Sequence, residues 1–351
     1  MENILNNAWH KFVEVPIAFQ GLVVESTSRC NAKCAMCYQS AGPKGSDVYG
    51  LAALSAHEIK KIIQDALQIN TLQRRFHLAG GEAFINLRDC TELFQFAKDS
   101  GYIDITTTTN CFWAKNPRKA MQVCEVIREA GLTRMEISWD HWHLSYVSPD
   151  CVNNALEACH ACGIRTNLRI LTTKEHSVGE ALSYLRSKSI DCAYEISSGP
   201  VFPTGRAAIE VDEETIFLAG KLSASCQHVL HLTINSQGNV YPCCAGADQT
   251  AGLSFGNVRE QSIIEIEKKL QNSPMFKVLA KQGVGALIPI LEKAGLLKKE
   301  KNYSNICHLC WDIFSDPAKT REIKMHFNRL EENAFDISAE LYKKLMRSHH
   351  E

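Results

Sequence analysis

The sequence lacks the features that mark membrane, secreted and nucleic-acid-binding proteins. It has 38 Lys and Arg against 39 Asp and Glu, and this near-zero net charge gives no basic field to attract nucleic acid or an anionic membrane. No run of about 18 apolar residues suits a membrane span, and the N-terminal stretch has no signal-peptide pattern. We therefore expect a cytoplasmic protein with neither a membrane nor a nucleic-acid partner.

Cysteine, by contrast, is abundant. The chain has 15 cysteines, an odd number, and several stand in C-x2-C pairs. Without an export signal this pattern favours thiolate metal ligands over a disulfide framework. Three of them, Cys30, Cys34 and Cys37, are too many for one disulfide and one short of the four ligands of a structural zinc site.

Strand and helix patterns alternate through the first half of the chain. Buried-strand patterns recur six times, and most of the helix patterns between them begin at a capping signal such as Ser55 with Glu58 or Asn116-Pro117. The expected strands are residues 21–27, 75–80, 102–109, 134–138, 164–172 and 192–197. Such alternation predicts an α/β fold with a parallel sheet, and six units are too few for an eightfold barrel. We expect a partial (β/α)6 barrel with its chemistry at the carboxyl ends of the strands.

The second half of the chain has a different pattern. A short hairpin is expected at residues 230–243, with its turn at Gln237-Gly238, and helical patterns run over about 260–296 and 317–348. This change predicts an α+β domain after the barrel. The expected division is a barrel core at 1–197, a bridging segment at 198–225, a second domain at 226–315 and a C-terminal helix at 316–351.

The first cysteine group follows the first expected strand directly. Three thiolates on one loop can hold three irons of a [4Fe–4S] cluster and leave the fourth iron open; a zinc knuckle or buried thiols are the alternatives. The C-x3-C-x2-C pattern of Cys30, Cys34 and Cys37 resembles the signature of radical S-adenosylmethionine (SAM) enzymes, with Met36 in the usual aromatic position and Tyr38 after the last cysteine. The resemblance implies that the open iron chelates SAM, whose reductive cleavage gives a 5′-deoxyadenosyl radical that abstracts hydrogen from a substrate.

Polar residues at the ends of strands two to five extend this resemblance. "AGGEAF" (79–84) looks like the Gly-Gly-Glu motif of the family, in which the glycines let the backbone approach SAM and the acid receives its amino group. The alternative for Gly80, Gly81 and Glu82 is an ordinary loop. The alternative for Arg169 is a salt bridge at the barrel rim. The residues that the resemblance assigns to SAM binding are Gly80, Gly81, Glu82, Asn110, Ser138, Asp140 and Arg169.

A second cysteine set resembles the auxiliary-cluster domains of the same superfamily, the SPASM and twitch types. Its ligands would be Cys226, Cys243, Cys307 and Cys310, with Gly238 at the sharp hairpin turn between the first two. A full SPASM domain has seven cysteines, so four imply the shorter twitch form with one auxiliary [4Fe–4S] cluster. A zinc ribbon with the same ligands is the alternative, because ligand identity alone does not separate the two metals.

The resemblance implies a function in the maturation of a ribosomally made peptide, by crosslinking, oxidation or epimerisation. The alternatives are radical dehydrogenation of a carbohydrate or aminocyclitol and a non-catalytic metal-binding scaffold. A reductant such as flavodoxin or ferredoxin is the expected partner. Cys111 follows Asn110 at a strand end, so we expect it to line the active cavity. Cys111 and Cys244, which is next to Cys243, are candidate hydrogen donors, and His141 and His143 are candidates for substrate binding or acid–base chemistry.

Overall fold

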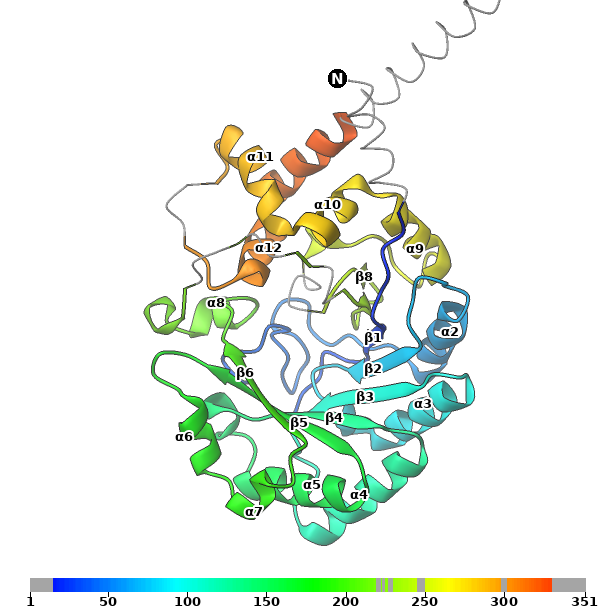
Figure 1. The fold of residues 1–351 in the computed structure, drawn as a ribbon, viewed down its shortest axis with the longest axis vertical. Helices are drawn as coiled ribbons and strands as arrows, with labels where there is room; N and C mark the ends of the chain where they lie inside the picture. Colours follow the sequence, from blue (N-terminus) through cyan, green and yellow to red (C-terminus); the bar gives the residue numbers. More distant parts are fainter. Residues whose placement is uncertain are drawn as a thin grey trace, which may run out of the picture.

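The chain folds around one curved sheet. The computed structural model describes residues 15–218, 222, 225–226, 230–244, 250–297 and 302–329. Eight strands lie in the order β6-β5-β4-β3-β2-β1-β7-β8, with β6 and β8 at opposite ends, so the sheet is open (Figure 1). The expected α/β fold with a partial barrel is confirmed.

All six expected barrel strands are present, and each pairs in parallel with the next. They are β1 Leu22–Glu25, β2 Arg75–Ala79, β3 Asp104–Thr109, β4 Arg134–Ser138, β5 Arg165–Thr172 and β6 Glu195–Pro200. The last strand begins and ends three residues later than expected, because its pairing with β5 runs from Asn167↔Glu195 to Thr172↔Pro200. The carboxyl end of β6 thus reaches Pro200.

Helices cover the outer side of this sheet (Figure 1). They are α2 Ala56–Ala66, α3 Leu87–Asp99, α4 Pro117–Glu129, α5 Pro149–Ala161, α6 Val178–Ser183 and α7 Ser187–Ile190. Ser55 and Glu58 form the expected capping box of α2, and proline begins α4 and α5. Their apolar faces pack on the strands in one buried cluster that includes Ile63, Phe76 and Phe94. This packing fixes the strand ends on which the candidate site is built.

The expected hairpin forms, and it extends the barrel sheet. Strand β7 (Leu232–Ile234) pairs in parallel with β1, and β8 (Val240–Tyr241) pairs antiparallel with β7. Gly238 lies in the turn with φ +87°, and a Cβ there would be 2.8 Å from the Asn257 side-chain oxygen. The hairpin was assigned to the second domain, yet its backbone hydrogen bonds join it to the first strand of the barrel.

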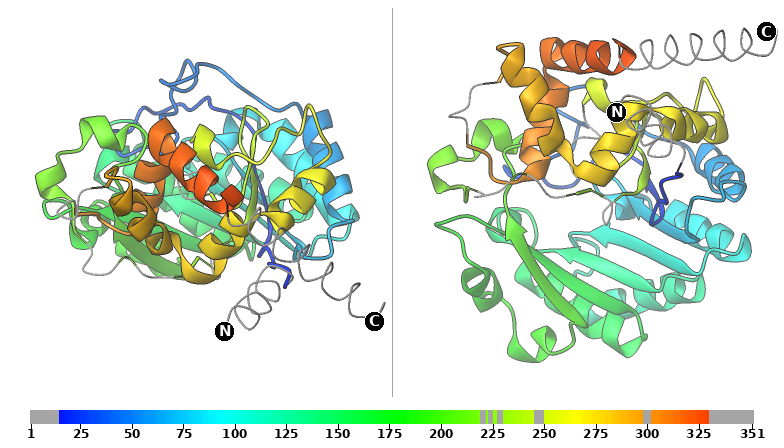
Figure 2. Two further views of the ribbon diagram at one scale, coloured as in Figure 1. Left: turned by 90° about the horizontal axis from the view of Figure 1, so that it is seen from above. Right: turned by 45° about the horizontal axis from the view of Figure 1, so that its top comes forward.

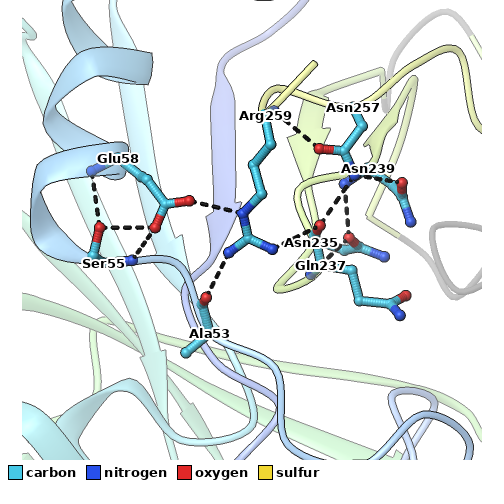
Figure 3. A network of polar contacts seen from close by, with 8 residues as sticks. All are labelled: Ala53, Ser55, Glu58, Asn235, Gln237, Asn239, Asn257 and Arg259. Carbon is cyan, nitrogen blue, oxygen red and sulfur yellow. Dashed lines mark hydrogen bonds and ion pairs between the residues drawn. The ribbon is translucent and has the colours of Figure 1, made fainter. Parts of the chain in front are cut away.

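A polar network ties this hairpin to the barrel helix α2 (Figure 3). The Arg259 guanidinium donates to the Glu58 carboxylate at 2.8 Å, to the Ala53 carbonyl at 2.8 Å and to the Gln237 carbonyl at 3.3 Å. The Arg259 hydrogen bond is the main reason why the pKa of Glu58 falls to about 2. Asn257 holds the turn from the other side, because its amide donates to the Gln237 carbonyl. One arginine therefore connects the hairpin turn with the barrel.

The short helix α8 (Ala207–Glu210) lies near β6 (Figure 1). The later helices lie together at the end of the molecule away from α4 and α5 (Figures 1 and 2). They are α9 Ile263–Asn272, α10 Pro274–Gln282, α11 Ile288–Lys293 and α12 Ile306–Ser315, and residues 317–329 are also helical. Pro274 and Gly283 interrupt the helical pattern expected over 260–296. The C-terminal part of the expected helix at 317–348 lies outside the described residues. None of the described helices has the length and apolarity that a bilayer crossing requires.

Candidate active site

A cavity of about 350 Å³ opens at the carboxyl ends of the barrel strands. This is the position at which βα loops gather in α/β barrels. Every site residue predicted in the barrel except Cys111 and His141 lines the cavity, and Cys244 joins them from the hairpin. The lining residues in question are Cys30, Cys34, Cys37, Gly80, Gly81, Glu82, Asn110, Ser138, Asp140, Arg169 and Cys244.

The three cysteines of the first loop face this cavity from one short segment. Cys30 and Cys34 are 8% and 6% exposed, and burial raises the pKa of Cys30 to about 12 and the pKa of Cys34 still further. Burial likewise raises the pKa of Cys37. Thiols in such a setting stay protonated unless a metal cation stabilises the thiolate. The donor set therefore fits a bound metal centre better than a reactive thiol.

The number of cysteines gives information on the kind of centre. A structural zinc site takes four protein ligands. This loop offers three thiols to the cavity wall. Three thiolates can each bind a different iron of a [4Fe–4S] cube, so the donor set fits an iron–sulfur cluster with one open iron.

The Gly-Gly-Glu segment packs against the chain just before the first cysteine. The Gly81 and Glu82 amides donate to the Thr27 and Arg29 carbonyls at 2.6 and 2.9 Å. A Cβ on Gly80 would lie 2.9 Å from the Thr27 carbonyl oxygen, and one on Gly81 would lie 2.4 Å from the Arg29 carbonyl oxygen. The glycines therefore permit close contact between two backbone segments, and this contact positions the loop that starts at Cys30.

Glu82 connects the end of β2 to the end of β3. It is 2% exposed, and its carboxylate accepts from the Phe84 amide at 3.1 Å, the Thr109 hydroxyl at 2.9 Å and the Asn110 amide at 2.8 Å. Burial nevertheless raises the pKa of Glu82 to about 7. The Asn110 side chain in turn donates to Asn31 at 3.0 Å, beside Cys30. A carboxylate has room for about four hydrogen bonds, so Glu82 keeps one site for a cationic ligand in the cavity.

The two histidines after β4 point to different places. His143 lines the cavity, and its Nδ1 lies 2.8 Å from the buried carboxylate of Asp140. His141 is half-exposed and stacks on His176, and the Nδ1 atoms of these two rings lie 3.2 and 3.1 Å from the oxygens of Glu180. Since the two rings are nearly parallel, at 14°, they do not converge on one ion. His143 is therefore a cavity residue, whereas His141 ties its loop to α6.

The two candidate hydrogen donors also separate. Cys111 was expected to line the cavity, and this expectation is wrong: the side chain is fully buried in the main hydrophobic cluster. The physical reason is the backbone, because φ of +64° at Cys111 turns the chain after Asn110 and sends the thiol inward. Burial, with the charges of Glu82 and two neighbouring cysteines, raises its pKa. Cys244 does line the cavity.

The second cysteine set comes together from three parts of the chain. Cys226 precedes the hairpin, Cys243 follows it, and Cys307 and Cys310 lie one turn apart on α12. Burial raises the pKa of Cys310, and Cys243, Cys226 and Cys307 are each near enough to Cys310 to raise it further. Asn305 caps α12 directly before this pair. The predicted auxiliary set is thus gathered at one place.

Several cavity residues were missed in the sequence. His77 on β2 faces the lumen between the Thr106 and Thr108 hydroxyls, and burial lowers its pKa to about 4. Glu136 on β4 also lines the cavity, and burial raises its pKa. The period-two alternation of the strands was the signal that could have identified both.

Thr204 adds a polar group to the cavity wall. Its hydroxyl is buried and has no hydrogen-bond partner among the described residues. An unsatisfied buried hydroxyl costs about 1–3 kcal/mol, so a polar ligand atom at this wall would relieve the penalty. The cavity therefore combines metal-ligating thiols with polar groups suited to a bound organic cofactor or substrate.

Comparison with known proteins agrees with this geometry. A family model described as the radical SAM superfamily matches residues 24–186, and one described as an iron–sulfur cluster-binding domain (SPASM) matches residues 226–311. The solved structure titled "Native anSMEcpe with bound AdoMet" superposes with a TM-score of 0.52 at 15% identity, over 90% of this chain and 99% of that chain. That likeness establishes a shared fold.

The curated proteins that are similar in sequence include the following two. "Putative peptide biosynthesis protein YydG" of Bacillus subtilis is 23% identical over 300 residues, which cover 83% of this chain and 91% of that protein. "Probable GTP 3′,8-cyclase" of Metallosphaera sedula is 30% identical over 119 residues, 34% of this chain and 33% of that protein. The first similarity spans both the barrel and the second domain, whereas the second is local.

Proposed function

Because the chain belongs to the radical SAM superfamily and carries an auxiliary iron–sulfur domain, we propose that it modifies a peptide and that Cys244 returns a hydrogen atom to the substrate. When bound, the [4Fe–4S] cluster and SAM supply a 5′-deoxyadenosyl radical that removes hydrogen from a substrate carbon. Return of hydrogen to that carbon from the opposite face would be an epimerisation. Family membership favours this enzymatic reading over a metal-binding scaffold.

The residues of the cavity have distinct proposed tasks. Cys30, Cys34 and Cys37 hold the catalytic cluster. Glu82, held by three donors, presents its remaining acceptor site to the amino group of SAM, and Arg169 offers a cation to the SAM carboxylate. These assignments follow from the position of each group on the wall of one cavity.

The position of Cys244 is the observation that carries the proposal. It lines the same cavity as the cysteine triad, whereas its neighbour Cys243 belongs to the set around Cys310. A thiol S–H bond is weak enough to give a hydrogen atom to a carbon radical. The new C–H bond leaves a sulfur radical, and one electron and one proton from a flavodoxin- or ferredoxin-type reductant and solvent restore the thiol. Cys111, buried in the core, is not placed for this transfer.

The peptide class of substrate is supported by the relative in Bacillus subtilis, which is named a putative peptide biosynthesis protein and aligns along most of both chains. Dehydrogenation of a small metabolite is the competing proposal. It would leave a peptide unchanged.

The test uses the reconstituted enzyme in heavy water with a peptide encoded beside its gene. Chiral analysis of the hydrolysed product should show D-residues that carry one deuterium at the α-carbon. Cys244→Ala should stop deuterium incorporation while 5′-deoxyadenosine still forms. Cys111→Ala is the matched control, and it should incorporate deuterium as the parent enzyme does. Full deuterium incorporation by Cys244→Ala would refute the role of this thiol, and an unmodified peptide would refute the substrate class.

A further inference from the structure

Arg206 is a fully buried arginine that contacts the cysteine loop from outside the barrel. It is 2% exposed and lies just after β6, in the segment "PTGRA" (203–207). Its guanidinium donates to the carbonyls of Cys34 at 2.9 Å, Ser40 at 2.6 Å and Ala41 at 2.7 Å, and its Nε donates to Asp47 at 2.7 Å. One side chain thus binds both ends of the turn that contains the last two cysteines.

The backbone beside Arg206 adds to this contact. The Arg206 amide donates to the Cys37 carbonyl at 3.0 Å. Gly205 precedes it with φ of +58°, and a Cβ there would lie 2.0 Å from the Tyr38 carbonyl oxygen. The bridging segment therefore lies directly against the cysteine loop, with no space for a larger residue.

The chemistry of arginine explains why this residue suits the position. A guanidinium presents five donors in a rigid plane and stays charged when buried, whereas a lysine offers one flexible point charge. Carbonyl oxygens bound by a charged donor are held more strongly than those bound by a neutral one. The positive charge also lies next to the backbone of Cys34, where a reduced iron–sulfur centre would carry additional negative charge.

We propose that Arg206 is a positioning residue of the catalytic centre: its fork holds the 34–41 turn in the shape that presents the three thiols, and its charge favours the reduced state of the cluster bound there. This inference rests on the family and the geometry, and it does not depend on the peptide substrate. It also gives the bridging segment a direct physical connection to the catalytic loop.

The test compares three variants of the reconstituted holoenzyme. Arg206→Met removes both the fork and the charge, and Arg206→Lys keeps the charge without the fork. Arg259→Met is the matched control, because Arg259 likewise binds one carboxylate and several backbone carbonyls, two against the three of Arg206, but lies at the hairpin turn, outside the candidate cavity. The measurements are hydrogen exchange of amides 30–47, iron per chain, and the midpoint potential of the cluster whose electron paramagnetic resonance signal changes when SAM is added.

Arg206→Met should shift that midpoint to a more negative potential. In Arg206→Lys the midpoint should lie close to the parent value, because the positive charge is kept. Both variants should speed exchange over 30–47 by about tenfold to a hundredfold, the ratio for loss of one hydrogen bond to a charged donor. Amides of β3 and β4 should keep the parent rate, and Arg259→Met should change neither quantity.

Parent values for Arg206→Met in both measurements would overturn the proposal. A uniform rise of exchange across β3 and β4 in both Arg206 variants would overturn it as well, because the arginine would then support the whole fold. If Arg206→Met loses its iron, the Arg206→Lys variant decides. Faster exchange confined to 30–47 with a parent-like midpoint potential supports the proposal. A clearly more negative midpoint in Arg206→Lys, which keeps the charge, contradicts it.

Discussion

Replacing Glu82 by glutamine should remove a pH-dependent loss of unfolding free energy from the metal-free chain. Glu82 is fully buried, and its pKa is raised from an ordinary value of 4.5 to about 7 because burial disfavours the charged carboxylate. The folded chain therefore binds a proton here more tightly than the unfolded chain does. As pH rises through the interval between 4.5 and about 7, the unfolded carboxyl loses its proton first, and the fold loses stability.

The magnitude follows from the difference between the two pKa values. A shift of roughly 2.5 units at about 1.4 kcal/mol per unit corresponds to about 3 kcal/mol of unfolding free energy. The amide introduced by Glu82→Gln does not titrate, so the stability of this variant minus that of the parent should rise by about this amount between about pH 4.5 and about pH 8. Any hydrogen bond that the amide makes less well is a constant offset. His77, whose pKa is lowered to about 4, acts in the opposite direction but cancels in the difference.

The assay is urea unfolding of the anaerobic, reduced, metal-free chain, followed by tryptophan fluorescence at half-unit pH steps. The control is Glu92→Gln, because the hydrogen bond from Lys60 lowers the pKa of Glu92, so its contribution to stability changes only below pH 4.5 and its difference from the parent should stay flat across the range tested. A difference between Glu82→Gln and the parent that stays flat across this pH range would refute the argument from burial.

Three further predictions concern the metal sites and the loop contact. Cys34→Ser should abolish 5′-deoxyadenosine formation in the reconstituted enzyme. Cys192→Ser should keep the parent rate, because Cys192 is half-buried beside the Lys188 carbonyl of α7 and does not line the cavity. Cys307→Ser should lower the iron content from about eight to about four per chain, again with Cys192→Ser as control, and unchanged iron would contradict an auxiliary cluster at this position. Gly81→Ala places a Cβ 2.4 Å from the Arg29 carbonyl oxygen, so it should lower the unfolding free energy by about 1–3 kcal/mol and cause loss of iron. Gly179→Ala is the control, because a Cβ there would be 3.8 Å from its nearest neighbour, and it should leave the unfolding free energy in the urea titration unchanged.

Local sequence patterns were sufficient for the barrel. Hydrophobic periodicity and capping signals such as Ser55 with Glu58 predicted each βα unit, because these signals act within a few residues of the chain. The strand β6 shifted by three residues because its bounds depend on pairing with β5, which a local pattern does not contain. The hairpin was predicted with its glycine turn, but its place beside β1 came only from long-range pairing.

The candidate site was likewise predicted in part from local sequence, and the rest depended on tertiary structure. The spacing of Cys30, Cys34 and Cys37 directly after a strand was enough to place them at the cavity, because every parallel strand ends on the same side of the sheet. Local sequence did not determine which of two neighbouring residues faces that cavity. Cys111 turned into the core at a backbone φ of +64°, and His141 turned toward Glu180.

The sequence by itself determined the element order and the thiol-bearing loop, since both depend on residue type and short-range spacing. Tertiary structure alone decided that Cys244 shares the catalytic cavity and that Arg206, from a segment far away along the chain, binds the loop of Cys34. The physical reason is that a buried charge must find its hydrogen-bond partners in space, and nothing in the neighbouring sequence records where those partners lie.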